Sequence, residues 1–148
     1  MDERNGRVEL LVVEDDPNDL ELIMRALKRH NLGNNVRHVG DGQEALDILL
    51  GERRSEIHGP PRVVLLDLKL PKVDGLTVLR ALRGDPRTRF LPIVVLTSSQ
   101  EERDLVDSYE LGVNSFIVKP LNFDEFVRVV GEIGLYWVLF NRAPDVEP

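Results

Sequence analysis

The hydrophobic pattern of this chain alternates between two kinds of segment. Short runs that are apolar almost throughout and rich in Val, Leu and Ile predict β-strands buried on both faces. Between these runs, apolar residues recur every three or four positions, which is the pattern of an amphipathic α-helix. The predicted strands are residues 8–13, 36–39, 62–67, 93–97 and 114–118.

Each apolar run is followed by a residue that can begin a helix. Asp16 stands directly before a proline, and proline is favoured at the first helical position. Asp41 and Ser99 are each followed three positions later by Glu, which predicts a capping box. Asp74 and Asn122 are the predicted caps of the two remaining helices. Strand and helix therefore alternate five times, which indicates an α/β fold: a doubly wound, five-stranded parallel sheet covered by helices on both faces.

Polar side chains stand where four of the predicted strands end. The carboxyl ends of parallel strands meet at one edge of the sheet, and ligand sites of this architecture lie there. We therefore expect these side chains to converge. They are Glu14 and Asp15 after the first strand, Asp67 at the end of the third, Thr97 at the end of the fourth and Lys119 after the fifth.

This set of side chains favours metal-assisted phosphate chemistry. Carboxylates brought together repel one another, so they must take up protons or bind a cation. Mg²⁺ often uses one or two carboxylates and leaves its other positions to water and phosphate. Lys119 and Thr97 can hold a tetrahedral anion beside Asp67, whose carboxylate can act as a nucleophile and form an acyl phosphate. Singly, each residue has an ordinary explanation, such as Asp16 capping a helix; the combination is what points to a site.

Four motifs resemble those of the receiver domain of two-component response regulators. LLVVEDDPND resembles the acidic motif of its first strand, and LLDLKLPKVDG resembles its phosphoacceptor motif. VLTSS resembles its switch segment, and FIVKP resembles its Lys-Pro segment. The resemblance covers residues 8–131, which we expect to form one receiver domain. It implies a flavodoxin-like (βα)5 fold with strand order 2-1-3-4-5.

The resemblance implies a metal site around the phosphoacceptor. Asp67 would be the residue that is phosphorylated. Asp15 and Asp67 would ligate Mg²⁺ directly, and Glu14 would act mostly through water. The backbone carbonyl of Lys69 would be the third protein ligand. Glu14 is a departure from the family pattern, since many members carry Asp there, and its longer side chain can alter the metal geometry.

The resemblance also implies a switch. Lys119 would contact the phosphoryl group, and the Lys119–Pro120 peptide bond would be cis. Thr97 and Phe116 would be the switch pair, whose movement changes the face formed by the fourth helix, fifth strand and fifth helix. Phe116 stands where Tyr is frequent, which excludes a switch that depends on a Tyr hydroxyl. The Phe116 ring can still turn inward when Thr97 moves.

Composition argues against several other classes of protein. The net charge of −7, from 26 acidic and 19 basic residues, disfavours a general binder of nucleic acid or anionic membranes. The chain has no cysteine, so disulfides, thiolate catalysis and Cys-based zinc sites are excluded. No signal peptide and no apolar run of roughly 20 residues is visible. We expect a cytoplasmic protein that binds neither nucleic acid nor membrane.

The C-terminal segment predicts an extension of the last helix. Its apolar residues follow the three- and four-residue spacing of a heptad seam. A helix that is apolar on nearly every side is typical of an interface. We expect residues 132–148 to contribute to a homodimer, with a segment folded back on its own domain as the alternative. No output domain is expected to follow, so the output would be a protein contact. The predicted interface residues are Phe126, Val130, Ile133, Trp137 and Phe140.

A narrower resemblance concerns the partner. The tail, the loop at 51–61 and the segment 85–99 resemble the small response regulators that partner bacterial phytochromes. The implied partner is a light-regulated sensor histidine kinase. The sequence leaves open whether the chain is an end-point signal, a phosphate sink or a phosphorelay intermediate.

Two other functions compete with this interpretation. A haloacid-dehalogenase-type phosphatase also uses a strand-end Asp nucleophile, but it needs a second Asp two residues later, where this chain has Lys69. A flavodoxin-like FMN binder would need a phosphate loop rich in Ser, Thr and Gly where Glu14 and Asp15 stand. We therefore expect no enzyme in the usual sense, only a protein that catalyses its own phosphorylation and dephosphorylation.

Overall fold

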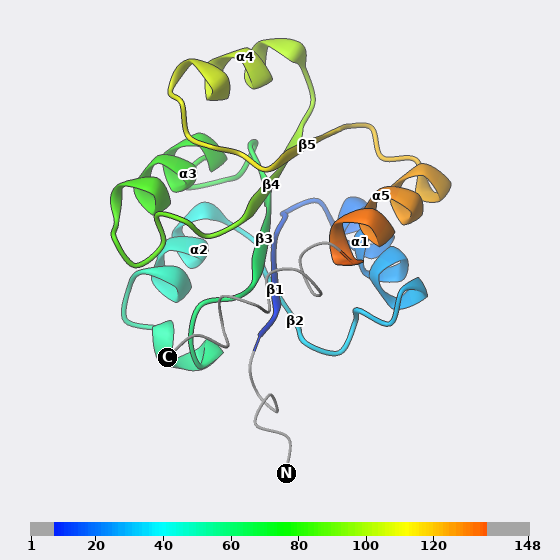
Figure 1. Ribbon diagram of the computed structural model, residues 1–148, viewed down its shortest axis with the longest axis horizontal. Coiled ribbons are helices and arrows are strands. Elements are labelled where there is room, and N and C mark those ends of the chain that lie inside the picture. Colours follow the sequence, from blue (N-terminus) through cyan, green and yellow to red (C-terminus); the bar gives the residue numbers. More distant parts are fainter. Residues whose placement is uncertain (1–7, 136–148) are drawn as a thin grey trace.

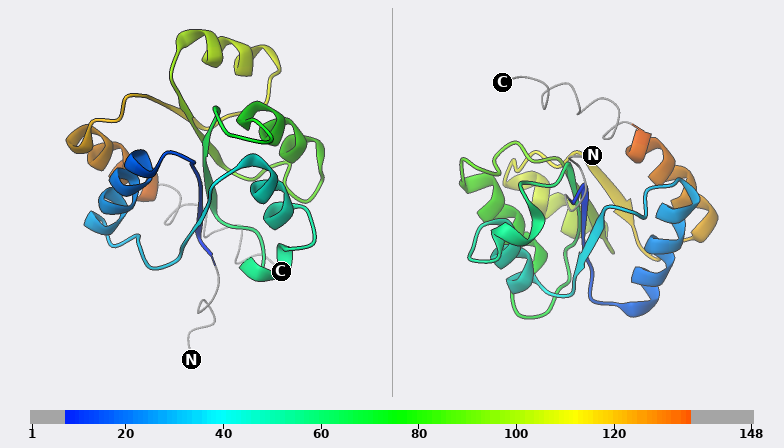
Figure 2. Two further views of the ribbon diagram at one scale, coloured as in Figure 1. Left: turned by 180° about the vertical axis from the view of Figure 1, so that it is seen from behind. Right: turned by 90° about the horizontal axis from the view of Figure 1, so that it is seen from below.

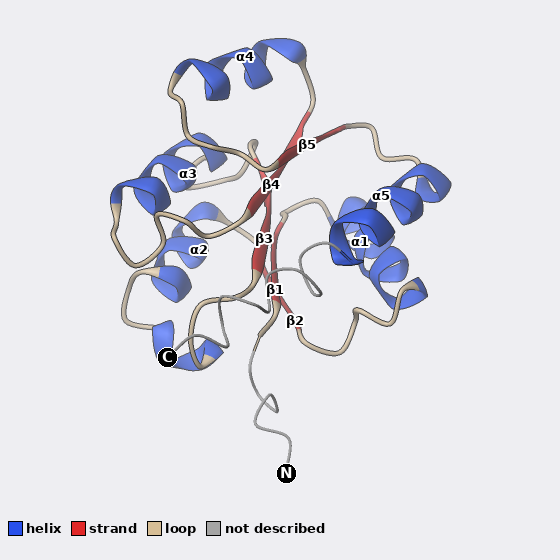
Figure 3. Cartoon of the chain, in the orientation of Figure 1, coloured by secondary structure: helices blue, strands red, loops and turns tan. Residues whose placement is uncertain are grey.

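A computed structural model describes residues 8–135, in which strands and helices alternate along the chain (Figure 3). The strands are β1 (Leu10–Val13), β2 (Val36–Val39), β3 (Val63–Asp67), β4 (Ile93–Thr97) and β5 (Ser115–Val118). The helices are α1 (Pro17–Arg29), α2 (Gly42–Leu49), α3 (Gly75–Gly84), α4 (Gln100–Ser108) and α5 (Phe123–Leu135), with a short 3₁₀ helix, η1 (Arg54–Ile57). The predicted α/β alternation is confirmed.

The strands form one parallel sheet in the order β2-β1-β3-β4-β5, as predicted (Figure 1). Leu66 of the central strand β3 pairs with Val13 of β1 on one side and Val95 of β4 on the other. All three side chains are fully buried. The chain reverses its direction of winding between β1 and β3, and ligand sites of open α/β sheets lie beyond this point.

Helices cover both faces of the sheet (Figure 2). α1 and α5 lie on one face, and α2, α3 and α4 lie on the other. Successive residues of a strand point to opposite faces. In β4, Val94 therefore joins the core beneath α1 and α5, whereas Ile93 and Val95 join the core on the α2 and α3 side. This explains why the strands are apolar at nearly every position.

The predicted caps position the helices against the strand ends. Asp16 accepts hydrogen bonds from two backbone N–H groups in the first turn of α1, and Asp41 accepts one from Glu44 in α2. Asp74 caps α3 in the same way. The capping box of α2 differs in one respect from the sequence prediction. The Glu44 carboxylate accepts from the N–H of Gly40 at 2.9 Å, one residue before the cap.

Gly75 allows α3 to begin directly against the end of β3. A Cβ atom at this position would lie 2.3 Å from the carbonyl oxygen of Asp67 and 2.5 Å from Cα of Leu68, both backbone atoms. The N–H of Gly75 donates to the Leu68 carbonyl oxygen at 2.8 Å. Glycine is needed where two backbone segments approach this closely. The segment that carries Lys69 is thereby folded tightly onto the end of the strand.

The segment 51–61 is more ordered than the loop that the sequence predicts, because η1 lies within it. Arg53 and Glu56 form an ion pair across this turn, with Nε and Oε2 2.8 Å apart. Ile57 is buried, with 3% of its surface exposed. One apolar anchor and one ion pair stabilise a single turn, which is too short to produce a hydrophobic period.

The structure corrects the prediction for two residues of α5. The sequence places Phe126 and Val130 at a homodimer interface, but they are only 2% and 5% exposed within one chain. Both belong to the core between α5 and the sheet, because the apolar face of α5 is needed to cover β4 and β5. Ile133 lies in α5, but its side chain is not described. Trp137 and Phe140 lie outside the described residues.

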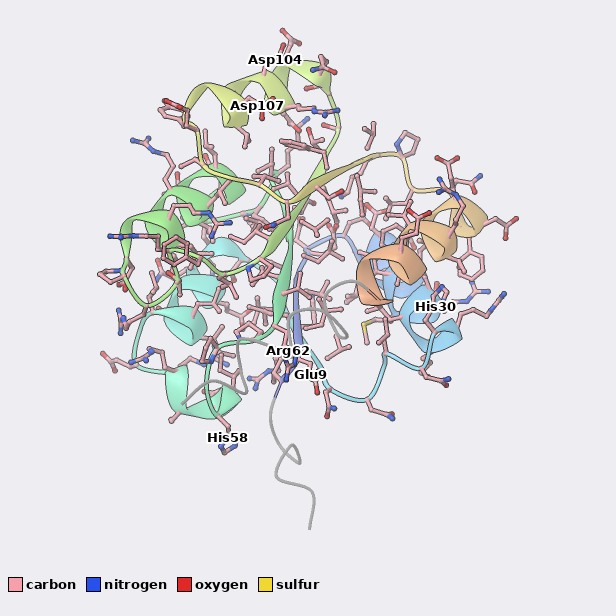
Figure 4. The ribbon with its side chains drawn as sticks, viewed as in Figure 1. Glu9, His30, His58, Arg62, Asp104 and Asp107 are labelled. Atoms are coloured by element: carbon pink, nitrogen blue, oxygen red, sulfur yellow. The ribbon has the colours of Figure 1, made fainter. Side chains whose placement is uncertain are left out.

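The opposite end of the sheet is closed by polar contacts. Glu9 and Arg62 lie together at the amino ends of β1 and β3, with Arg62 Nε 3.2 Å from Glu9 Oε1 (Figure 4). His30, at the end of α1, places its Nε2 2.6 Å from the Val127 carbonyl oxygen of α5. Within residues 8–135, no helix has the length and hydropathy that a membrane span requires.

Candidate functional site

Three carboxylates meet at the carboxyl edge of the sheet. Glu14 and Asp15 directly follow β1, and Asp67 is the last residue of the adjacent strand β3. One carboxylate oxygen from each residue lies within 4.8 Å of the others. Glu14 is 0% exposed and Asp67 is 4% exposed, whereas Asp15 is exposed to solvent. The parallel topology thus brings together acidic residues that lie about a third of the chain apart.

The ammonium group of Lys119, one residue beyond β5, lies among these carboxylates. Its Nζ is 2.8 Å from Asp67 Oδ2 and 3.0 Å from Glu14 Oε1. It is also 2.8 Å from Asp19 Oδ2. The peptide bond between Lys119 and Pro120 is cis. Burial by itself lowers the pKa of Lys119, but its close contacts with the three carboxylates outweigh this effect and raise the pKa above its ordinary value.

Asp19 is a site residue that the sequence analysis does not select. It stands in the first turn of α1, where an acidic residue is already explained by the helix dipole. Its position four residues after Asp15 is the signal that could have identified it. One helical turn beyond the strand end, Asp19 returns to the edge of the sheet and reaches Lys119.

Glu14 lies in an environment that disfavours its charged form. Burial raises the pKa of Glu14 to about 7, and the hydrogen bond and negative charge of Asp67 act in the same direction. The N–H of Asp16, 3.1 Å from Glu14 Oε2, and the nearby ammonium group of Lys119 partly offset this rise. Oε1 is buried and makes no hydrogen bond, although it lies within ion-pair distance of Lys119. The carboxylate therefore has unused capacity for a cation.

The carboxylate cluster fits a hard divalent cation. Its donor atoms are all carboxylate oxygens, which are the ligands that Mg²⁺ prefers in proteins. Glu14 Oε1 lacks a hydrogen bond, and Asp15 is accessible from solvent. Asp15 and Asp67 are the residues that would hold the ion directly, with Glu14 behind them. A bound divalent cation would neutralise part of the charge that a phosphoryl group brings to Asp67.

The two oxygens of Asp67 have different surroundings. Oδ2 contacts Lys119, whereas Oδ1 accepts a hydrogen bond from the N–H of Lys69 at 3.1 Å. The peptide of Lys69 therefore lies beside Asp67, and the role of its carbonyl as a metal ligand stays a prediction. A cleft of about 510 Å³, lined in part by Asp15, Lys69 and Glu102, opens next to the cluster. A small phosphoryl donor has room to approach there.

Thr97 ends β4 and is 1% exposed, but its hydroxyl is engaged with α4. The one hydroxyl hydrogen is directed to Glu102 Oε1, at 2.8 Å, with the Ser99 carbonyl oxygen as a second, more distant acceptor at 3.1 Å. From the sequence alone, Glu102 is predicted only as part of a capping box. In the structure its carboxylate binds the predicted switch residue and accepts from the N–H of Ser98 at 2.9 Å.

Phe116, the other predicted switch residue, lies in β5 and is partly buried. The guanidinium carbon of Arg103 is 4.7 Å from the centroid of its ring, which is within cation–π distance. Both members of the predicted pair therefore contact α4, through two adjacent residues of that helix.

Comparison with known proteins identifies the class. Residues 10–131 match the family described as the response regulator receiver domain. The chain belongs to this family, whose fold the sheet order and the helices on both faces also display.

Three individual proteins illustrate how similar the relatives of this chain are. The bacteriophytochrome response regulator RtBRR is 51% identical, with a TM-score of 0.76 over 88% of this chain and 80% of that one. Response regulator Rcp1 of Synechocystis sp. is 35% identical over 137 residues, 93% of each chain. Its Mn²⁺-bound form has a TM-score of 0.74 over 88% of this chain and 94% of that one. "Probable methanogenesis regulatory protein FilR2" of Methanothrix harundinacea is 44% identical over 137 residues, 91% of this chain and 86% of that protein.

These matches place the chain among receiver proteins of similar length, of which several are phytochrome response regulators. FilR2 is named for another process, so similarity of this degree does not by itself specify the input signal.

Proposed function

We propose that this protein is a response regulator that accepts a phosphoryl group on Asp67 from a sensor histidine kinase, with Mg²⁺ as the cofactor. The observation that carries the proposal is the ion pair of buried Asp67 with Lys119, within a cluster of carboxylates suited to a divalent cation. Membership of the response regulator receiver family supports the same assignment.

The transfer needs little chemistry from the protein beyond positioning and charge. A carboxylate oxygen of Asp67 attacks the phosphorus of a phosphohistidine, the P–N bond breaks, and its electron pair leaves with the imidazole. Lys119 offsets charge on the transferred oxygens. For dephosphorylation, water attacks the phosphorus, the bond to Asp67 breaks, and the carboxylate and inorganic phosphate are released.

The proposed output begins with Thr97. A phosphoryl group on Asp67 adds negative charge and acceptor oxygens. The Thr97 hydroxyl turns toward them, and Phe116 turns into the space that is vacated. The face formed by α4, β5 and α5 then changes, so that the phosphoryl group shifts the balance between two conformations of one fold.

Metal removal tests this proposal. Incubation with acetyl phosphate and Mg²⁺ is expected to add one phosphoryl group to the chain, seen by intact-mass spectrometry. The same incubation with excess EDTA is expected to add none, because the carboxylates then repel the incoming donor. Borohydride trapping and peptide mapping should locate the modification at Asp67. Equal modification with EDTA, or modification elsewhere, would contradict the proposal.

The proposed kinase is a bacterial phytochrome. RtBRR supports this partner because it is named as a bacteriophytochrome response regulator and its similarity spans 88% of this chain. The measurement is phosphotransfer from an autophosphorylated bacteriophytochrome, compared with transfer from an unrelated histidine kinase at equal concentration. Equal rates from both kinases would count against a phytochrome partner.

We also propose a homodimer formed by the end of α5 and residues 136–148. A pocket of about 200 Å³ opens beside α5, with mainly apolar residues such as Leu10, Leu32 and Ile117 around it. The sequence adds two large apolar side chains after α5, Trp137 and Phe140, which a second copy would cover.

Removing the two aromatic side chains tests the dimer. A Trp137→Glu/Phe140→Glu chain is expected to sediment with half the mass of the unaltered chain, because charges cannot be buried in an apolar contact. Phe90→Glu is the matched control: Phe90 is 86% exposed in the α3–β4 connection and should leave the mass unchanged. A monomeric mass for the unaltered chain would refute the dimer.

A further inference from the structure

We propose that Glu102 and Arg103 are positioning residues that hold the two switch side chains in their unphosphorylated arrangement, and so set how readily Asp67 is phosphorylated. The inference rests on the proposed function. It assigns a role to two adjacent residues at the beginning of α4, each of which contacts a different member of the pair Thr97 and Phe116.

Glu102 competes directly with the phosphoryl group for Thr97. Its Oε1 atom accepts the Thr97 hydroxyl at 2.8 Å and the N–H of Ser98 at 2.9 Å. The hydroxyl has one hydrogen atom, so it cannot donate fully to Glu102 and to a phosphoryl oxygen at Asp67 at once. Phosphorylation must therefore break this charge-assisted hydrogen bond. Lys69 Nζ, 3.6 Å from Glu102 Oε2, adds only a weak contact because it is largely exposed.

The direction of the Glu102 side chain supports this role. In an ordinary capping box the Glu side chain returns to the N–H of the capping residue, which here is Ser99. Ser99 does accept the N–H of Glu102 at 3.1 Å. The Glu102 carboxylate, however, reaches past Ser99 to Ser98 and Thr97. The helix cap is thus joined to the switch, and the position of α4 depends on where the Thr97 hydroxyl points.

Arg103 acts on the second switch residue. Its guanidinium carbon lies 4.7 Å from the ring centroid of Phe116. Turning the ring inward removes this cation–π contact, so the contact favours the arrangement seen here. Because residues 102 and 103 are consecutive, one small displacement at the start of α4 can release Thr97 and Phe116 together.

The packing of α4 allows such a displacement. Val106 is its one fully buried side chain among those described, and Leu105 is 48% exposed. The cleft of about 510 Å³ separates this side of α4 from residues 68–71, and Asp104 points away from the body of the protein (Figure 4). The other end of α4 is better anchored: Tyr109 stacks with Arg80 of α3 at 4.6 Å.

The affinity for beryllofluoride in the presence of Mg²⁺ tests the proposal, because this anion mimics a phosphoryl group on Asp67. If the contacts of Glu102 and Arg103 must break before the anion binds, only the fraction of molecules in which they are broken can bind. The apparent affinity is lowered by that fraction. Glu102→Ala is expected to tighten beryllofluoride binding about tenfold, the size expected for one partly exposed hydrogen bond to a charged group. Glu102→Gln keeps an acceptor oxygen but loses the charge, so its affinity should lie between those of Glu102→Ala and the unaltered chain.

Glu101→Ala is the matched control for Glu102→Ala. Glu101 is an exposed acid in the same turn of α4, and its carboxylate makes no hydrogen bond to a described residue. Its removal costs the helix a similar first-turn charge, but it should leave the affinity unchanged. An amide NMR spectrum supplies a second signature. The Thr97 signal of Glu102→Ala without beryllofluoride should move toward its position in the bound, unaltered chain.

Repeating the Glu102 substitution in a Thr97→Val chain separates the effect of the Glu102–Thr97 hydrogen bond from a general effect on α4. If Glu102 acts through the Thr97 hydroxyl, Glu102→Ala changes the affinity less than twofold in this background. A tenfold effect that persists without the hydroxyl, or equal affinities for the Glu101 and Glu102 variants, overturns the proposal. Absence of beryllofluoride binding by the unaltered chain would instead overturn the proposed function.

Arg103→Ala is expected to tighten binding about threefold, the size of an exposed cation–π contact. Arg80→Ala is its control, since Arg80 makes the same kind of contact with Tyr109, which is not a switch residue. If both substitutions changed the affinity equally, the cation–π contacts would act only through the stability of α4. The proposed positioning role of Arg103 would then be wrong.

Discussion

An Asp67→Asn chain is expected to take up no phosphoryl group from acetyl phosphate and Mg²⁺, where the unaltered chain takes up one. The amide oxygen is a far weaker nucleophile than a carboxylate, so no acyl phosphate forms. The fold should persist, because Asn has the same shape and its oxygen can still accept from Lys119 or from the N–H of Lys69. Intact-mass spectrometry and circular dichroism together measure both expectations.

Asp16→Asn is the matched control. Asp16 is an exposed acid of the same strand-end motif, but its carboxylate caps α1. Asn caps helices about as well as Asp, so this chain should be phosphorylated normally. Modification of the Asp67→Asn chain at the normal level would show that another residue is the acceptor and would remove the basis of the proposed function.

Lys119→Met is expected to have opposite effects on phosphorylation and on metal binding. The rate of phosphorylation by acetyl phosphate should fall about 100-fold, because a preorganised charge that stabilises the transferred oxygens is lost. The affinity for Mg²⁺ should rise, because the ammonium group and the metal repel each other and compete for oxygens of Asp67 and Glu14. Methionine keeps the length of the apolar stem.

The Lys119→Met prediction is measured by the initial rate of phosphorylation at saturating Mg²⁺ and by a separate Mg²⁺ titration. Mg²⁺ should also raise the unfolding temperature more in this variant than in the unaltered chain, since three carboxylates have lost their counter-ion. Lys72→Met is the control: Lys72 is 69% exposed, and its Nζ is 3.6 Å from Asp41. A fall in both the rate and the Mg²⁺ affinity would mean that Lys119 only supports the fold.

The strand-end residues could be selected from the sequence because a simple rule connects them. Parallel strands end at one edge, so Glu14, Asp67 and Lys119 had to lie near one another once their runs were identified as strands. Asp19 could not be distinguished from an ordinary first-turn acid. Its role depends on the length and direction of the Lys119 side chain, which no periodic pattern describes.

The spacing of apolar residues predicted the structure of α5 only in part. It correctly placed Phe126 and Val130 on an apolar face, but it could not say whether the chain itself would cover them. Phe126 and Val130 proved to be core residues because β4 and β5 need a helix on that face. In the same way, a Glu three residues after a Ser predicted the start of α4, but not that Glu102 would extend to Thr97.

By itself, the sequence determined the alternation of strands and helices, the helix caps and the set of groups at the strand ends. These features depend on interactions between near neighbours or on the burial of a whole face, and both leave a repeating trace in the chain. Tertiary structure alone decided that Asp19 joins Lys119, that Glu102 binds Thr97 and that Arg103 stacks on Phe116. Those contacts depend on side-chain directions and on distances of a few ångströms between separate elements. Neither produces a periodic pattern in the sequence.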